Sequence, residues 1–238
     1  MTQTIQLGDI EVDVVLKKVK NLHLSVYPPV GAVRISAPEH MTLETIRVFA
    51  ISKLAWIKQE RRKLQDQARE TPREYLDRES HFVWGERRLL RVEEVDAAPS
   101  VQLLPKQLLL RVRPDTDEAK RQALVARWYR DQVRGVLPPL IAKWEPQLGV
   151  TVGQVFVQKM KTKWGSCNPD TASIRLNSDL AKKVPECLDY VLLHELTHLL
   201  EPTHSERFKQ LLDGFMPHWR SWRDELNRAP LAHEAWTY

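Results

Sequence analysis

The segment VPECLDYVLLHELTHLLEPTHSERF, residues 184–208, decides the architecture expected for this chain. Pro185 suits the first position of a helix, and Glu186 favours the positive end of the helix dipole. An apolar stripe at helical spacing follows, made of Leu188, Val191, Leu192, Leu196 and Leu199. Pro202 ends the helix, so the segment predicts one amphipathic helix followed by a point where the chain can turn back.

His194, Glu195 and His198 in this segment form the pattern H-E-x-x-H. On a helix that turns by about 100° per residue, His194 and His198 project in nearly the same direction and can bind one ion. Glu195 then lies beside the metal, where it can act as the general base on a metal-bound water. The pattern and its helical context predict a centre that holds one Zn²⁺ ion.

Two residues compete to be the third protein ligand. Glu201 would follow His194 and His198 along the same helix, in a row roughly 10 Å long at ~1.5 Å per residue, which cannot close around one tetrahedral ion. His204 comes after the break at Pro202, where the chain can return toward the metal. His204 is therefore assigned as the ligand, and Glu201 is left as a candidate hydrogen-bond partner for an imidazole N–H.

Length and composition limit the classes of protein that the chain can belong to. Its 238 residues suffice for one large or two small domains. No stretch approaches the ~18 consecutive apolar residues of a membrane span, and residues 1–30 lack a signal-peptide pattern. Cys167 and Cys187 fit buried thiols, because they form no C-x-x-C motif. We expect a cytoplasmic protein without a membrane partner, and its net charge of +5 permits anionic partners without requiring them.

The first part of the chain predicts a β-rich region. Apolar and polar residues alternate at 10–14, 22–26 and 33–35, which is typical of short antiparallel strands. A helix that Thr42 can cap follows, and its apolar face should cover this small sheet. Residues 58–80 carry many charges of both signs, which favours a solvated helix or linker and gives only weak support to a nucleic-acid contact. Further strands are expected at 82–92 and 101–112.

A long helix is predicted after these strands. Asp115 and Glu118 resemble a capping box, and Leu124, Val125, Trp128 and Val133 lie on one face. Pro138 and Pro139 should interrupt this helix, with a second helical piece that ends near Pro146 and Gly149.

Residues 150–180 precede the H-E-x-x-H helix and predict two strands. Val155 and Val157 alternate with polar residues, Asn168-Pro169-Asp170 is a turn signal, and a strand returns at 173–176. Lys159, Lys161 and Lys163 would share one face of the first strand. These lysines either protect a sheet edge or form a basic rim beside the metal that receives an anionic or extended substrate, and both interpretations stay open.

Four motifs resemble the YgjP-like zinc metallopeptidase family, which is related to the SprT and WLM zincins. They are KTKWGSCN at 161–168, SIRLNSDL at 173–180, DYVLLHELTHLL at 189–200 and HSERF at 204–208. The resemblance places the metal ligands at His194, His198 and His204 and the catalytic glutamate at Glu195. It also implies that the hairpin led by Trp164 lies next to the active-site helix. The departures from the family pattern remove no ligand; they are Lys163, Thr197 and Thr203.

Taken together, the residues and the resemblance predict an α+β fold. Residues 1–112 are expected to form an N-terminal antiparallel β-rich subdomain with one long covering helix. Residues 113–238 are expected to form a zincin-like metallohydrolase domain with a small sheet and the H-E-x-x-H helix.

The function expected first is a metallopeptidase in which Glu195 activates a zinc-bound water and an extended peptide or protein lies along residues 155–177. Relatives of the SprT and WLM type suggest a version that acts on DNA-associated proteins. An anionic small molecule is the alternative substrate, since a nucleoside triphosphate (UTP-type) pyrophosphohydrolase activity is also attached to the family, although the chain has no G-x-x-x-x-G-K-[ST] loop. A non-catalytic, metal-stabilised scaffold is the remaining alternative.

Overall fold

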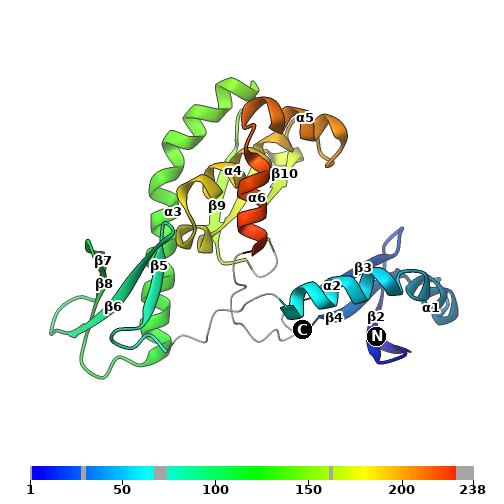
Figure 1. Ribbon diagram of the computed structural model, residues 1–238, viewed down its shortest axis with the longest axis horizontal. Coiled ribbons are helices and arrows are strands. Elements are labelled where there is room, and N and C mark those ends of the chain that lie inside the picture. Colours follow the sequence, from blue (N-terminus) through cyan, green and yellow to red (C-terminus); the bar gives the residue numbers. More distant parts are fainter. Residues whose placement is uncertain (1, 28–30, 67–73, 161–162, 229–238) are drawn as a thin grey trace. The chain divides into compact units, whose positions relative to one another are not determined.

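The computed structural model describes residues 2–27, 31–66, 74–160 and 163–228 (Figure 1). Within these residues the fold is α+β, as expected, with three small sheets and six α-helices. The described residues form two compact units, one within 2–66 and the other within 74–228. The expected functional division between residues 112 and 113 stays a prediction, and it falls inside the second compact unit.

The first unit is a four-stranded sheet covered by two helices. Its elements are β1 (Thr2–Leu7), β2 (Ile10–Lys17), β3 (His23–Tyr27), β4 (Ala32–Pro38), α1 (Leu43–Ser52) and α2 (Leu54–Asp66). Thr42 caps α1 as predicted, because its hydroxyl accepts a hydrogen bond from the Thr45 amide at 3.3 Å. The helix does not continue unbroken, since Lys53 separates α1 from α2. Val12, Ile35 and Ile46 are fully buried between the sheet and the helices.

The strands of this sheet are not all antiparallel, which corrects the expected arrangement. The order is β1-β2-β4-β3, in which the two outer pairs are antiparallel and the central pair β2 and β4 is parallel. Along the chain, β3 comes between β2 and β4, but in the sheet it lies at the edge beside β4. Because β3 runs opposite to β4, β4 has the same direction as β2. Alternating hydrophobicity reports which face of a strand is buried, but not which neighbour the strand pairs with.

The second unit begins with a sheet of the same topology. Its strands are β5 (Ser80–Val83), β6 (Glu86–Glu94), β7 (Ser100–Leu103) and β8 (Gln107–Val112), in the order β5-β6-β8-β7 with a parallel central pair. The single strand expected at 82–92 is divided by a two-residue turn, in which Trp84 and Gly85 both have positive φ angles of 49° and 82°. Both units therefore contain two antiparallel hairpins followed by a capped helix. The sequence shows no repeated motif at a fixed spacing that would reveal this similarity.

The helix α3 (Glu118–Leu148) runs without a break through Pro138 and Pro139, contrary to the predicted interruption. The prolines remove backbone donors, but buried side chains on both sides of them hold the helix against the unit. These side chains are Val125, Tyr129, Val133, Leu137, Trp144 and Leu148. The helix ends at Gly149 in the left-handed conformation, as predicted, while its N-cap is Asp117 rather than Asp115.

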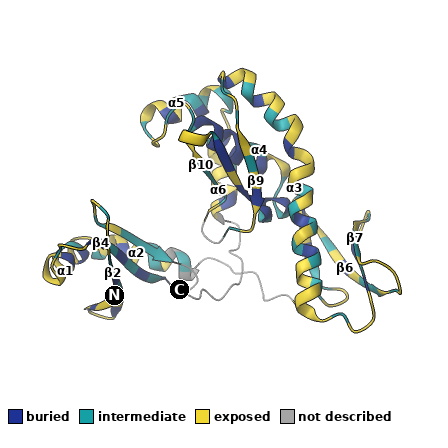
Figure 2. Ribbon diagram, turned by 180° about the vertical axis from the view of Figure 1, so that it is seen from behind, coloured by how far each residue is buried: buried dark blue, intermediate teal, exposed yellow. Residues whose placement is uncertain are grey.

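A three-stranded sheet and three helices complete the second unit. They are β9 (Gln154–Gln158), β10 (Gly165–Asn168), β11 (Ser173–Asn177), α4 (Pro185–Thr197), α5 (Glu206–Phe215) and α6 (Trp219–Arg228), with short 3-10 turns at Pro169–Thr171 and Ser178–Lys182. The sheet order is β10-β11-β9, so β10 lies at an edge. α3 and α4 pack against this sheet, and buried residues concentrate there (dark blue in Figure 2).

Candidate metal centre

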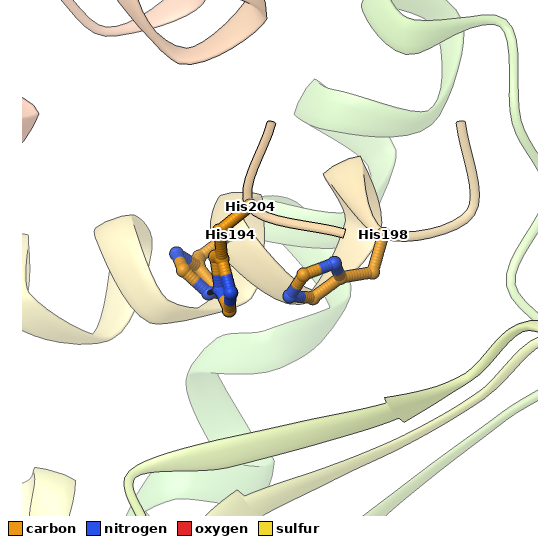
Figure 3. A group of neighbouring side chains, drawn as sticks. All are labelled: His194, His198 and His204. Atoms are coloured by element: carbon orange, nitrogen blue, oxygen red, sulfur yellow. Dashed lines mark hydrogen bonds between the residues drawn. The ribbon is translucent and has the colours of Figure 1, made fainter. Parts of the chain in front are cut away.

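Three histidines converge where α4 ends and the chain turns back. His194 lies in the last turn of α4, His198 is its C-cap, and His204 lies in the loop before α5 (Figure 3). One ring nitrogen of each residue lies within 4.8 Å of the others. The Nε2 atoms of His194 and His204 are 3.0 Å apart. Within the part of the chain that the structure describes, these three histidines are the one group of three or more His, Cys, Asp or Glu side chains placed so that they could hold a metal ion.

The reversal of the chain occurs earlier than Pro202 alone would require. α4 ends at Thr197, and the amides of Leu200 and Glu201 both donate to the Thr197 carbonyl at 3.0 Å. His198 keeps helical dihedral angles, φ −65° and ψ −16°, so its ring still projects in the direction set by the helix. The loop then returns His204 to the same place, which is the arrangement expected for a third ligand after a break.

Hydrogen bonds to two of the imidazoles orient their rings. The Nδ1 atom of His198 lies 3.2 Å from the main-chain carbonyl of Glu201. A carbonyl only accepts, so Nδ1 of His198 carries the proton and its Nε2 keeps a lone pair for a metal. Glu201 is thus a hydrogen-bond partner of an imidazole, as predicted, but through its main-chain carbonyl. Its carboxylate accepts a hydrogen bond from the Thr203 hydroxyl at 3.0 Å instead. The Tyr190 hydroxyl lies 3.4 Å from Nδ1 of His194.

Phe208 packs against all three imidazoles. Its ring centroid lies 4.9 Å from His194, 4.7 Å from His198 and 4.9 Å from His204. Phe208 is placed by α5, whose first turn is capped by Ser205, since Ser205 Oγ accepts a hydrogen bond from the Phe208 amide at 3.2 Å. The aromatic ring therefore holds the helix-borne histidines and the loop-borne histidine in one cluster.

Phe208→Ala is expected to lower the free energy of unfolding by about 3–5 kcal/mol, because a deleted core ring leaves a cavity. Phe208 is 2% exposed, and the cavity would lie beside the three imidazoles, so metal affinity should fall as well. Urea denaturation of metal-free protein and a metal titration measure the two effects. Phe156→Ala is the matched control, because Phe156 is 42% exposed and its loss should cost less than ~1 kcal/mol. Equal losses in the two variants would contradict the packing role.

Glu195 is the buried carboxyl group of the site. Its side chain is 6% exposed, and burial raises its pKa to about 7, against the opposing effect of the Lys163 ammonium. A pKa near neutrality suits a group that both accepts and releases a proton. Glu195 opens onto a cavity of about 470 Å³ that also contains His194 and His204 in its wall.

The cavity wall combines residues from distant parts of the second unit. Besides α4, it is formed by Lys163, Trp164 and Gly165 at the start of β10, Phe208 and Lys209 of α5, and Trp219, Arg223, Leu226 and Asn227 of α6. Tyr190 stacks on Trp219 with ring centroids 6.1 Å apart. Tyr190 could have been found from the sequence, because it precedes His194 by one helical turn. The α6 residues carry no local signal that relates them to the histidines.

The other predicted site residues divide into those at the cavity and those away from it. Lys163 lines the cavity, Lys161 lies outside the described residues, and Lys159 is exposed. β9 ends at Gln158, so Lys159 and Lys163 do not share a strand face, which corrects that expectation. Cys167 and Cys187 are free thiols, and burial raises the pKa of each to about 11.

The donor set fits a zinc ion. Burial, together with the nearby His198 and His204, lowers the pKa of His194 to about 3, so this imidazole is neutral at pH 7 and its lone pair is free to bind. The 3.0 Å between two Nε2 atoms is close to the roughly 3.3 Å expected for ligands about 2.0–2.1 Å from a tetrahedral zinc. Three protein nitrogens are also the number that hydrolytic zinc sites use.

A helix-borne H-E-x-x-H pair, a third histidine from the next loop and a buried glutamate beside them are the groups that metal-dependent hydrolases of the H-E-x-x-H class use. Comparison with protein families narrows this class. The YgjP-like, metallopeptidase domain matches residues 20–229, and the chain therefore belongs to the YgjP-like family.

Solved structures provide more distant similarities. The metallopeptidase zymogen abylysin of Pyrococcus abyssi is 22% identical, over 37% of this chain and 89% of its own, with a TM-score of 0.35. The metallopeptidase zymogen jannalysin of Methanocaldococcus jannaschii is also 22% identical, over 41% of this chain and 92% of its own, with a TM-score of 0.31. The comparison with curated proteins found no match. Among the described helices, none has the length and apolar character needed to cross a membrane.

Proposed function

We propose that this chain is a zinc-dependent metallopeptidase with a zincin-like catalytic part within residues 113–238. His194, His198 and His204 hold one zinc ion, and Glu195 is the general base. The observation that carries the proposal is the convergence of three imidazoles, two of which, His194 and His204, line one cavity together with the buried carboxyl group of Glu195. Membership of a metallopeptidase family supports a protein substrate over other substrates of hydrolases.

Zinc, when bound, supplies Lewis-acid polarisation of the scissile carbonyl and lowers the pKa of a water toward ~7. Glu195 accepts the proton of the attacking water, because its carboxylate follows His194 directly and faces the same cavity. The raised pKa of Glu195 then lets it release this proton to the leaving nitrogen. The Glu201 carbonyl keeps the His198 ring in the tautomer that presents Nε2.

The edge strand β10 provides a place for an extended peptide. Among the described strands, β11 alone pairs with β10, and Gly165 at the start of β10 lines the cavity together with the preceding Trp164. A peptide that pairs with a sheet edge gains main-chain hydrogen bonds whatever its sequence, while pockets select the side chains. The scissile bond of a peptide along β10 would thus lie at the cavity that Glu195, His194 and His204 line.

The test compares zinc-loaded wild type with chelator-treated protein on unfolded proteins, on DNA-bound proteins and on nucleoside triphosphates. We expect peptide-bond cleavage, measured by mass spectrometry of the products, that disappears with the chelator and returns with zinc. Cleavage that rises with added DNA and falls with salt would assign the DNA-associated version. Proteins that stay intact under all conditions would contradict the peptidase proposal.

A nucleotide hydrolase is the second candidate, and the charge of the cavity wall favours it. Among the described residues, Lys163, Lys209 and Arg223 line the cavity together with a single carboxyl group, that of Glu195. This excess of cations would attract phosphates, although Lys209 is already paired with Glu206 at 3.0 Å and Arg223 with Asp224 at 2.9 Å. Release of pyrophosphate from nucleotides with no cleavage of proteins would favour this candidate.

A further inference from the structure

The backbone of β10 lies directly against the side chain of Glu195 at Gly165. A Cβ atom added to Gly165 would lie 2.6 Å from Glu195 Oε1, 2.8 Å from its Cγ and 2.9 Å from its Cδ. All three distances are below 3.0 Å, the shortest distance to a neighbouring heavy atom that Cβ atoms normally show. Any side chain at residue 165 would therefore clash with the carboxyl group of Glu195, and one of the two would have to shift.

The reason for glycine here is space and not backbone conformation. Gly8, Gly31, Gly85 and Gly149 have positive φ angles, whereas Gly165 does not, so other residues could adopt its backbone geometry. Glycine in a strand interior commonly marks the close approach of another group. At Gly165 the group that approaches is the carboxyl of Glu195.

The backbone at the beginning of β10 cannot easily move away from this contact, so the carboxyl end of Glu195 is the part that would have to shift. Gly165 pairs with Leu176, which is fully buried in β11, and the Asn177 amide donates to the Trp164 carbonyl at 2.9 Å. The Asn177 side-chain amide also donates to the carbonyl of Lys163 at 2.9 Å. These bonds hold the beginning of β10 in place. Glu195 is fixed at its other end by α4, whose neighbouring Leu196 is fully buried.

We propose that Gly165 is a positioning residue for Glu195, and that its bare Cα is the wall that fixes the carboxyl group beside the metal ligands. This inference rests on the proposed function, because positioning matters only if Glu195 is the base. A displacement of the carboxylate by about 1 Å can cost on the order of 10²-fold in rate. A methyl group at residue 165 would force a displacement of this kind.

The test is Gly165→Ala. We expect kcat for peptide cleavage to fall by about 10²-fold, with KM and the zinc content per chain unchanged. Two other glycines give matched controls. Gly214→Ala meets nothing within 4 Å and should keep the wild-type kcat, whereas Gly153→Ala meets the Thr171 carbonyl oxygen at 2.8 Å and should lower stability through the backbone alone.

A second measurement does not depend on activity. The shift of the urea midpoint that Gly165→Ala causes in metal-free protein should vanish when Glu195→Ala removes the opposing side chain, while the Gly153→Ala shift should persist. If Gly165→Ala alone does not fold, the double variant with Glu195→Ala should recover. Wild-type kcat in Gly165→Ala, or a midpoint shift that is the same in both backgrounds, would overturn the inference. If wild type cleaves no protein, the proposed function is wrong. The urea midpoints then still show whether Gly165 and the Glu195 side chain are in contact.

Discussion

Glu195→Gln is expected to reduce peptide cleavage by about 10²–10⁴-fold, the contribution of a general base, while zinc remains bound. Glutamine keeps the shape of the side chain and fits the space under Gly165, but its amide cannot accept the proton of water. The buried carboxyl group makes no ligand contact in the proposed site, so the three imidazoles should bind zinc as before.

Initial rates on one peptide, with zinc content measured on the same samples, separate these two effects. Glu186→Gln is the matched control, because Glu186 lies on the same helix, is exposed and should keep the wild-type rate. If the Glu195→Gln variant loses zinc together with activity, Glu195 has a role in the metal site itself. A rate within a few-fold of wild type would mean that another group activates the water.

His204→Ala should abolish the stabilisation that zinc gives to the fold. With free zinc at about 100 times its dissociation constant, wild type should gain about 2.7 kcal/mol of unfolding free energy, and the variant with two imidazoles should gain almost none. His204 is the informative position, because it is exposed and lies in a loop, so its loss should disturb the metal-free fold least.

Thermal melts with and without zinc measure this difference directly. His40→Ala is a suitable control, since His40 is an exposed histidine of the first unit. The control should show the full zinc-dependent shift. A shift that survives in His204→Ala would leave His194 and His198 as the ligands and would require a different third group. Peptide cleavage should be lost in parallel with the zinc-dependent shift.

Local signals predicted those features whose cause lies within one or two turns of chain. Thr42 caps the expected helix, Gly149 ends α3, and Asn168 begins the turn between β10 and β11. In each case a side chain or a permissive backbone satisfies groups only a few residues away, so the sequence pattern is sufficient. The four-residue spacing from His194 to His198 is also a local signal, because it places both side chains on one face of a helix.

Features that depend on distant partners were predicted incorrectly. Pro138 and Pro139 suggested an interruption of α3, but packing along one face outweighs the lost hydrogen bonds. The parallel pairing of β2 with β4, and of β6 with β8, depends on which strand fills the centre of each sheet. Hydrophobic alternation is the same for a parallel and an antiparallel neighbour, so it could not reveal this choice.

The H-E-x-x-H helix and the histidine after the break were determined by the sequence, because helical periodicity alone sets the directions of His194 and His198. The tertiary structure decided what surrounds them. It brought Phe208 against the three imidazoles, α6 to the cavity wall and Gly165 against Glu195. These contacts join segments with no common periodicity, and only the close packing of α4 between the sheet and its neighbouring helices fixes them.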